Sequence, residues 1–184
     1  MKSPTLASLL AELGIPAGYG KAPPLPLYAE AGSLVDVGPN IVGRLQTLAP
    51  VAASSWTAMQ SAAAADGVSL MLVSGFRSFE YQAELIRRKL ESGQLIDDIL
   101  QVNVAPGYSQ HHTGRAVDIA TPGSKPLLEE FEQTAAFDWL QSNARRFAFV
   151  LSYPRNNPLG IAYEPWHWYL TTEEDNDQQS QYLR

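Results

Sequence analysis

Two short segments, far apart in the chain, concentrate the residue types that bind divalent metals. The first, from His111 to Asp118, reads HHTGRAVD, and the second, from Glu164 to His167, reads EPWH. Together they hold all three histidines of the chain, with one Asp and one Glu. Because the chain has no Cys, a transition-metal site would have to be built from His with Asp or Glu. These segments are therefore the candidate metal site.

The first segment predicts a sharp turn that leads into a strand over residues 115–120. Asp118 lies among apolar residues of that strand, and a carboxylate in such a place is costly to bury unless it is paired or bound to a metal. Gly114 permits a sharp turn, which could fold His111 back beside Asp118. Taken alone, the spacing also fits a His in a loop and an Asp that accepts backbone hydrogen bonds.

The second segment is predicted to enter a strand over residues 166–170. Pro165 disfavours a helical conformation at Glu164, so the segment is not the helical pair of His residues four apart that one class of metalloproteases uses. We expect Glu164 just before the strand and His167 near its start. Taken alone, this pattern also fits a surface Glu and a core His.

The residue types of the two segments suit metal-assisted hydrolysis. Zinc commonly takes three protein ligands and leaves a fourth position for water, and His111, Asp118 and His167 can supply those ligands. Bound zinc lowers the pKa of water from about 15.7 to about 7, which gives a nucleophile at neutral pH. Glu164 can accept the proton of that water and pass it to a leaving amine.

A third segment, Ser74–Gln82, reads SGFRSFEYQ and joins two predicted elements. It follows an apolar run over residues 69–73, which predicts a buried strand, and Ser78 can cap a helix over residues 79–91. A guanidinium donates two parallel hydrogen bonds, so Arg77 at the strand end suits a carboxylate or a developing oxyanion. A surface Arg in a turn is the alternative.

The three segments resemble the zinc D-Ala-D-Ala carboxypeptidases of the VanY type, within the LAS group (lysostaphin, D-Ala-D-Ala peptidases, sonic hedgehog). The family pattern is SG[YF]RSxxxQ, then SxHxxGxAxD, then ExWH. It falls here on Ser74–Gln82, Ser109–Asp118 and Glu164–His167, and the preceding Pro106–Tyr108 matches as well. The motifs occur in the family's order within residues 48–170.

The resemblance implies a role for each motif residue. His111, Asp118 and His167 would hold one zinc ion, and Glu164 would be the catalytic base. Arg77 would polarise the scissile carbonyl or hold the substrate. Four further residues would contact the terminal region of the peptide or shape the pocket: Gln82, Ser109, Tyr108 and Trp166.

Two positions qualify the resemblance. The family places the ligand at the first His of the pair, so we assign His112 a supporting or packing role. Many relatives carry an Arg shortly after the WH pair, whereas this chain continues with Trp168, Tyr169 and Leu170. That departure concerns contacts at the edge of the substrate and leaves the metal chemistry intact.

The predicted elements mix helices and strands without regular βαβ alternation, which indicates an α+β fold with a small, mainly antiparallel sheet. The resemblance implies that this sheet carries a central zinc site and is flanked by helices. In the helix over 79–91, Tyr81, Leu85 and Leu90 form the predicted apolar stripe. The other predicted helices cover 4–13, 49–66, 95–101 and 134–146, and the strands cover 69–73, 115–120, 147–152 and 166–170, with irregular wrapping over 15–45.

A chain of 184 residues favours one domain. We expect a motif-bearing core over about 48–170, an N-terminal wrapping segment over 1–47 and a polar tail over 171–184. The net charge of −6 and the lack of a basic field argue against nucleic-acid binding. No apolar run reaches the length of a membrane span, and the N-terminus lacks the apolar core of a signal peptide. We therefore expect a cytoplasmic monomer; a chain trimmed of a leader would be periplasmic.

The resemblance implies a zinc carboxypeptidase that removes the C-terminal D-amino acid, D-Ala, from peptidoglycan stem peptides. A cytoplasmic enzyme would meet recycled muropeptides, which are mainly tetrapeptides, and this favours an L,D-carboxypeptidase in cell-wall recycling. The first alternative is a D,D-carboxypeptidase acting on pentapeptides that end in D-Ala-D-Ala. A phage-type endopeptidase would commonly carry Asp in place of Glu164, and a non-catalytic wall-binding module would lack Glu164 or a ligand.

Overall fold

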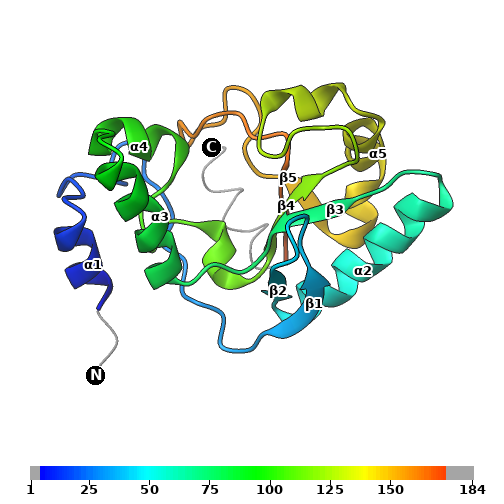
Figure 1. The fold of residues 1–184 in the computed structure, drawn as a ribbon, viewed down its shortest axis with the longest axis horizontal. Coiled ribbons are helices and arrows are strands. Elements are labelled where there is room, and N and C mark those ends of the chain that lie inside the picture. Colours follow the sequence, from blue (N-terminus) through cyan, green and yellow to red (C-terminus); the bar gives the residue numbers. More distant parts are fainter. Residues whose placement is uncertain (1–4, 173–184) are drawn as a thin grey trace.

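The computed structural model describes residues 5–172 of the chain, and its helices and strands are arranged as shown in Figure 1. The predicted polar tail lies outside the described residues from position 173 onward. The helices are α1 (Leu6–Glu12), α2 (Pro50–Ala65), α3 (Phe79–Glu91), α4 (Ile96–Val102) and α5 (Ala135–Asn143), with the short 3-10 helices η1 (Gln110–Thr113), η2 (Glu129–Gln133) and η3 (Ala144–Phe147). The strands are β1 (Val35–Pro39), β2 (Leu45–Leu48), β3 (Met71–Ser74), β4 (Ala116–Ala120), β5 (Phe149–Leu151) and β6 (His167–Leu170).

Four strands form a central antiparallel sheet in the order β3-β4-β6-β5. Strand β4, which carries the end of the HHTGRAVD segment, is therefore an inner strand, and β6 pairs with it directly. In this register Asp118 lies opposite His167, and Ser74 of β3 also lies opposite Asp118. A small antiparallel sheet with helices around it confirms the predicted α+β class.

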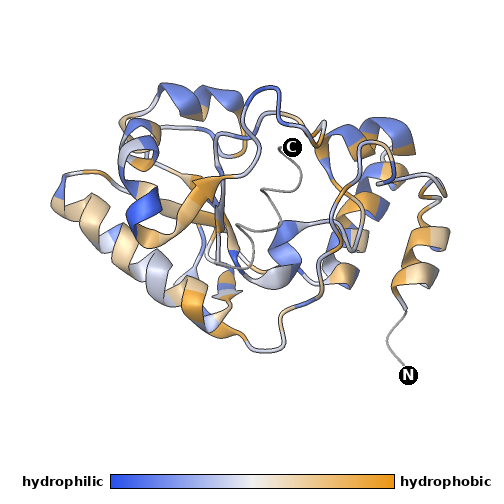
Figure 2. Cartoon of the chain, turned by 180° about the vertical axis from the view of Figure 1, so that it is seen from behind, coloured by the Kyte–Doolittle hydropathy of each residue, from blue (hydrophilic) through white to orange (hydrophobic). Residues whose placement is uncertain are grey.

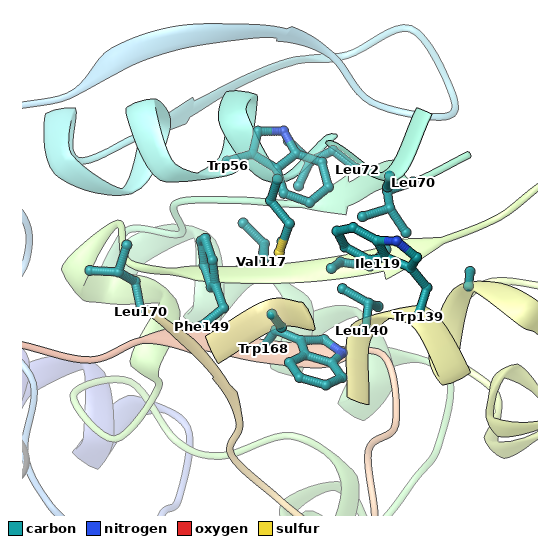
Figure 3. Packing of buried hydrophobic residues seen from close by; sticks show 14 of the residues in the cluster. Trp56, Leu70, Leu72, Val117, Ile119, Trp139, Leu140, Phe149, Trp168 and Leu170 are labelled. Atoms are coloured by element: carbon teal, nitrogen blue, oxygen red, sulfur yellow. The ribbon is translucent and has the colours of Figure 1, made fainter. Parts of the chain in front are cut away.

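One face of the sheet is packed against α2 and α5. Val117 and Ile119 of β4 belong to the same buried cluster as Trp56 of α2 and Leu140 of α5, and Figure 3 shows these side chains together. Because side chains alternate along a strand, Asp118 points to the opposite face of the sheet. The apolar layer therefore decides which face of β4 carries the carboxylate.

A second, smaller apolar cluster holds α1 against α3 and α4. Arg87 of α3 strengthens the contact with α1, since its guanidinium donates to Glu12 of α1 at 2.6 Å, and it also donates to Glu80 within α3 at 2.9 Å. In Figure 2 both α3 and α4 carry hydrophilic and hydrophobic residues, as expected for helices with one buried face. The buried members of this cluster are Leu9, Leu13, Ala83, Ile86 and Ile99.

Short side chains and a proline start three of the predicted helices. The hydroxyl of Ser78 accepts a hydrogen bond from the backbone of Tyr81 at 3.0 Å, and Thr134 accepts one from Phe137 at 3.2 Å. Pro50 is the first residue of α2, where its missing N–H costs no helical hydrogen bond. None of the helices between residues 5 and 172 has the length and apolar character needed to cross a membrane.

The prediction of irregular structure over residues 15–45 is wrong at its end. Strands β1 and β2 form an antiparallel hairpin in which Val35 lies opposite Leu48. Both strands are short and only Leu48 among their residues is buried, so they lack the apolar alternation that marks a half-buried strand. The hairpin was therefore not detectable from that pattern.

Two further boundaries differ from the prediction. The helix expected over 134–146 ends at Asn143 and continues as η3, so the strand expected over 147–152 is shortened to β5. Ala148, with a φ of 61°, makes the left-handed turn between η3 and β5. A left-handed residue that is not glycine carries no clear sequence signal, which explains the error.

A candidate metal centre and its cleft

Three different elements supply the candidate metal ligands. His111 comes from η1, Asp118 from β4 and His167 from β6. Gly114 makes the turn between η1 and β4 with a φ of 66°, and a Cβ atom there would lie 2.7 Å from the backbone nitrogen of Ala49. The tight turn brings His111 back, so that its Nε2 lies 3.2 Å from Asp118 Oδ2.

The ligand atoms face one another in a buried cluster. His167 Nδ1 lies 3.0 Å from Asp118 Oδ1, and one ligand atom from each of the three residues lies within 4.8 Å of the others. All three side chains are buried. The structure thus brings together the three side chains that the sequence analysis selected as metal ligands.

The outer nitrogen of each imidazole is already engaged. His111 Nδ1 donates to the carbonyl of Gly75 at 2.6 Å, and His167 Nε2 donates to Gln110 Oε1 at 2.9 Å. Such hydrogen bonds fix the tautomer, leaving the lone pairs of His111 Nε2 and His167 Nδ1 directed at Asp118. His111 Nε2 is buried and has no hydrogen-bond partner among the described residues. A metal cation would satisfy this nitrogen, so the three residues fit a metal ion.

The protonation states also suit a cation. Burial lowers the pKa of His111 to about 4, so this ring is neutral at pH 7. Burial opposes the ionisation of Asp118, but the charge and hydrogen bonds that His111 and His167 offer when they carry a proton towards it hold the pKa of this carboxyl well below its usual range. Metal ligands must be deprotonated, and both groups meet that requirement at neutral pH.

Glu164 lies beside the cluster without belonging to it. Its Oε2 is 3.7 Å from His167 Nδ1, and its side chain keeps 18% of its exposure. Burial raises the pKa of Glu164 to about 7. A carboxyl group poised near neutrality can both accept and release a proton, as a general acid–base catalyst must.

Arg77 reaches the cluster from the end of β3. Its Nη2 lies 3.7 Å from Asp118 Oδ2, and its buried Nε has no hydrogen-bond partner within residues 5–172. His112 holds the backbone of Arg77 in place. Its Nδ1 donates to the carbonyl of Arg77 at 2.6 Å, and its Nε2 accepts from Gly107 N at 3.1 Å. His112 is therefore placed as a support for Arg77 and lies outside the ligand cluster.

The cluster opens into a cavity of about 620 Å³, which is lined by most of the predicted substrate residues. Gln82, Ser109 and Trp166 lie on its wall, together with Arg77 and Glu164. Gln82 Nε2 donates to the carbonyl of Val104 at 2.8 Å, while its Oε1 is buried without a partner in the described part of the chain.

Tyr108 is the exception among the predicted substrate residues, because it does not line the cavity. Its hydroxyl donates to the carbonyl of Tyr19 at 3.4 Å, and the two rings meet edge to face with centroids 5.1 Å apart. Tyr19 itself lines the cavity. Tyr108 thus acts on the wall of the cavity by holding Tyr19.

Several residues of the site were not predicted from the sequence. Tyr153 lines the cavity and stacks on the His167 ring with centroids 4.7 Å apart, and Gln110 orients the same ring. Six residues between positions 18 and 25 form part of the wall as well: Gly18, Tyr19, Gly20, Ala22, Pro23 and Leu25. Tyr153 and residues 18–25 lie in segments without regular structure, where periodicity gives no signal, and Gln110 occupies a variable position of its motif.

The antiparallel sheet with a buried His–Asp–His centre, an adjacent Glu and a cleft defines a protein of the zinc-peptidase type. Comparisons with known proteins agree with this class. Residues 45–172 match the family model VanY, described as D-alanyl-D-alanine carboxypeptidase. The chain therefore belongs to the VanY family of D-alanyl-D-alanine carboxypeptidases, which confirms the resemblance drawn from the three motifs.

Individual relatives show how far the likeness extends. The chain is 33% identical over 117 residues to a D-alanyl-D-alanine carboxypeptidase of Enterococcus faecalis, covering 58% of this chain and 42% of that protein. Among solved structures, the LdcB LD-carboxypeptidase has a TM-score of 0.70 at 31% identity, covering 83% of this chain and 74% of that one. VanYB in complex with D-alanine-D-alanine has a TM-score of 0.61 at 26% identity, covering 91% and 87%. The chain thus spans less than half the length of the enterococcal relative.

Proposed function

We propose that this protein is a zinc-dependent carboxypeptidase that removes the C-terminal residue from peptidoglycan stem peptides. The observation that carries the proposal is the buried cluster of His111, Asp118 and His167, with the carboxyl group of Glu164 beside it, at the wall of a cavity large enough for a peptide. Family membership supplies the class of substrate.

In this proposal three side chains hold a single zinc ion. His111 binds through Nε2, His167 through Nδ1 and Asp118 through its carboxylate, because the other imidazole nitrogens are engaged by Gly75 and Gln110. Zinc bound there supplies Lewis acidity, which makes water a nucleophile at neutral pH. The hydrogen bonds from both rings hold the ligands in place before any metal arrives.

Glu164 carries out the proton transfers in the proposed reaction. Its carboxylate accepts the proton of the attacking water and later delivers it to the nitrogen of the leaving amino acid. Without a metal, burial raises the pKa of Glu164 to about 7. A cation at the cluster would lower that pKa and favour the carboxylate form that a base requires. Arg77 lies beside Asp118, with Nη2 3.7 Å from Oδ2. Its Nε has no partner within residues 5–172, which leaves a donor for the oxygen that becomes negative in the transition state.

The cavity wall would hold the peptide. We assign Gln82, Ser109 and Trp166 to contacts with the terminal region of the substrate, because all three line the cavity. Gln82 Oε1 has no partner in the described part of the chain, so it can accept a hydrogen bond from a peptide N–H. Tyr108 acts indirectly by holding Tyr19.

For the bond that is cut, we propose the L,D bond of tetrapeptide muropeptides in cell-wall recycling. The likeness to the LdcB LD-carboxypeptidase, with its TM-score of 0.70 and 31% identity, supports this choice. Cleavage of pentapeptides that end in D-Ala-D-Ala is the second candidate, supported by the family description and by the likeness to VanYB. A monomeric state and a cytoplasmic location stay predictions from the sequence.

Product analysis on defined muropeptides tests the proposal. Zinc-loaded protein would be incubated with tri-, tetra- and pentapeptide muropeptides and with a cross-linked dimer. We expect tripeptide and free D-Ala from the tetrapeptide, loss of activity with a chelator and recovery with added zinc. Tetrapeptide from the pentapeptide alone would establish the D,D alternative, and cleavage of the cross-linked dimer alone would indicate an endopeptidase. No product from any substrate would refute the enzymatic proposal.

A further inference from the structure

The cavity extends well beyond the metal cluster along one face of α3. Gln82, Leu85 and Lys89 all line it, and their spacing of three and four residues places them on the same side of the helix. Seven helical rises separate Gln82, the first residue of α3 that lines the cavity, from Lys89, which corresponds to about 10.5 Å. An extended peptide rises about 3.3–3.6 Å per residue. The cleft is therefore long enough to contact several residues of a substrate.

Lys89 brings an uncompensated positive charge to this remote part of the cavity. Its ammonium donates a hydrogen bond to Asn103 Oδ1, which also lines the cavity, and forms no ion pair with an acidic group within residues 5–172. An ammonium has three N–H donors, so the bond to Asn103 leaves donors for a further partner. Asn103 is neutral and orients the ammonium without cancelling its charge.

The neighbouring cations of the same helix behave differently. Arg87 pairs with Glu12 and Glu80, and Arg88 pairs with Glu84. At the metal cluster Arg77 lies near Asp118. Lys89 is half-buried, and removing a cation from water without a counter-charge costs free energy. A ligand that carries a negative charge into the cavity would offset that cost.

We propose that Lys89, oriented by Asn103, binds a carboxylate of the substrate peptide at the part of the cleft remote from the metal cluster. This inference rests on the proposed function. A stem peptide offers two such groups: the free α-carboxylate of the glutamate that is linked through its side chain, and the terminal carboxylate of the leaving residue. Both offer the same chemistry to an ammonium, a charge-assisted hydrogen bond.

The length of the cleft bears on which carboxylate is bound. The terminal carboxylate is one residue from the scissile bond, whereas the glutamate carboxylate lies further along the peptide on its amino-terminal side. About 10.5 Å of helix separates Lys89 from Gln82, which lines the cavity together with Arg77 and the metal cluster. This separation favours the glutamate carboxylate, and the experiment distinguishes the two.

The test measures peptide binding without turnover. Zinc-loaded Glu164→Gln protein serves as the parent, and calorimetry gives the Kd for tetrapeptides in matched pairs. One pair carries either a free or an amidated glutamate α-carboxyl group, and the other carries either D-alanine or D-alaninamide at its end. Lys89→Met is then added to the parent. Lys89→Arg serves as the conservative variant, and Arg88→Met removes the exposed neighbouring cation as a matched control.

We expect Lys89→Met to weaken binding of the free-glutamate peptide by about tenfold or more and to leave its amidated twin unchanged, because charged hydrogen bonds are worth about 1.5–3 kcal/mol. Lys89→Arg should retain most of the affinity, and Arg88→Met should have no effect. If Lys89→Met instead weakened binding of the peptide that ends in D-alanine and left binding of the peptide that ends in D-alaninamide unchanged, Lys89 would be assigned to the terminal carboxylate.

Equal effects of Lys89→Met on both members of each pair, or no effect at all, would overturn the inference while leaving the proposed function intact. A parent protein that binds zinc but none of the peptides would overturn the proposed function and the inference with it. Thermal unfolding of each variant would show that the fold is retained, since Lys89 contributes only a partly buried hydrogen bond to it.

Discussion

Asp118 and Glu164 are two carboxyl groups of one site whose surroundings move their pKa values in opposite directions. Burial opposes ionisation of both. Asp118 nevertheless has its pKa held well below the usual range by His111 and His167 beside it, whereas burial dominates at Glu164 and raises the pKa of that group to about 7. Such a separation assigns different tasks to two chemically similar side chains. Asp118 is suited to stay charged and bind a cation, and Glu164 is suited to exchange a proton.

Replacement of Glu164 by Gln should abolish turnover and leave zinc binding intact. The amide has nearly the same shape but cannot accept the proton, and general acid–base catalysis contributes about 10²–10⁴-fold to a rate. Zinc content by atomic absorption and the rate of D-Ala release would be measured on the same preparation. His167→Ala is the contrasting variant and should lose both. Substantial turnover by the Gln variant would remove Glu164 from the role of base.

The raised pKa of Glu164 also predicts how the stability of the metal-free protein depends on pH. The folded protein holds this proton up to a pH of about 7, whereas the unfolded chain releases it near the ordinary value of 4.5. Between these values the folded state binds more protons, so the contribution of Glu164 to stability falls as the pH rises and is lost above about 7.

The Gln variant, which resembles the protonated acid, should therefore match the parent at pH 4.5 and exceed it at pH 8 by up to about 3 kcal/mol. Urea unfolding of both proteins in the presence of a chelator would measure the difference. The difference between the parent and the Gln variant reports the effect of Glu164 alone. His111 and His112, whose pKa values are lowered to about 4, titrate in the same pH range but are present in both proteins. An identical difference at both pH values would contradict the expected shift.

Much of the site could be predicted from residue types alone, because few groups bind zinc and this chain contains only three His. Other contributions had no such signal. Gln110 acts through a hydrogen bond to His167, and Tyr153 acts through ring stacking. Both residue types are common, and only the folded chain brings them to the metal cluster.

At the level of the elements, β4 is the best-predicted part of the molecule. Its predicted range of 115–120 agrees with the observed strand, and side-chain alternation puts Val117 and Ile119 on the face opposite Asp118, which is the face packed against the core. Helix α3 was less well predicted, because the expected apolar stripe of Tyr81, Leu85 and Leu90 is not the buried face. The structure instead buries Gln82, Ala83 and Ile86, while Leu85 lines the cavity. A helix that carries both a core face and a cleft face has two apolar stripes, which a single periodicity does not separate.

The turn between η1 and β4 should tolerate no side chain at Gly114. A Cβ atom would lie 2.7 Å from Ala49 N, and the φ of 66° disfavours other residues by about 1–2 kcal/mol. Gly114→Ala should therefore destabilise the protein by more than the cost of φ alone and weaken zinc binding, since His111 and Asp118 flank the turn. Gly123, with a φ of 83° and no atom within 4 Å, is the matched control.

Urea unfolding and zinc titration of both Ala variants would measure these effects. Gly123→Ala should show only the backbone cost and unchanged zinc affinity. If Gly114→Ala and Gly123→Ala lost the same stability and zinc affinity, the close contact with Ala49 would not be the cause of the loss at Gly114.

For the whole molecule, the N-terminal region is more than a covering segment. Residues before position 45 lie outside the family-matched range of 45–172, yet α1 is packed on α3 and six of these residues line the cleft: Gly18, Tyr19, Gly20, Ala22, Pro23 and Leu25. The wrapping segment predicted over 1–47 did not include this contribution to the site. Long-range packing between irregular segments leaves no periodic pattern in the sequence.

Leu9→Ala should test the coupling between this region and the rest of the chain. Leu9 is 1% exposed in the cluster formed by α1, α3 and α4, and truncation of such a residue costs about 2–5 kcal/mol. Leu95, which is 70% exposed, provides the control and should cost little when changed to Ala. Chemical unfolding monitored by tryptophan fluorescence would compare them, and a loss below about 1 kcal/mol at Leu9 would show that α1 is only loosely attached.

The direct pairing of Asp118 with His167 across β4 and β6 has a practical consequence. A shift of one residue between these strands would turn the carboxylate toward Val117's side of the sheet and separate it from both imidazoles. The stoichiometry of captured zinc therefore reports whether the two strands have aligned correctly. A simple metal assay on refolded material would distinguish native molecules from compact chains whose overall secondary structure looks the same.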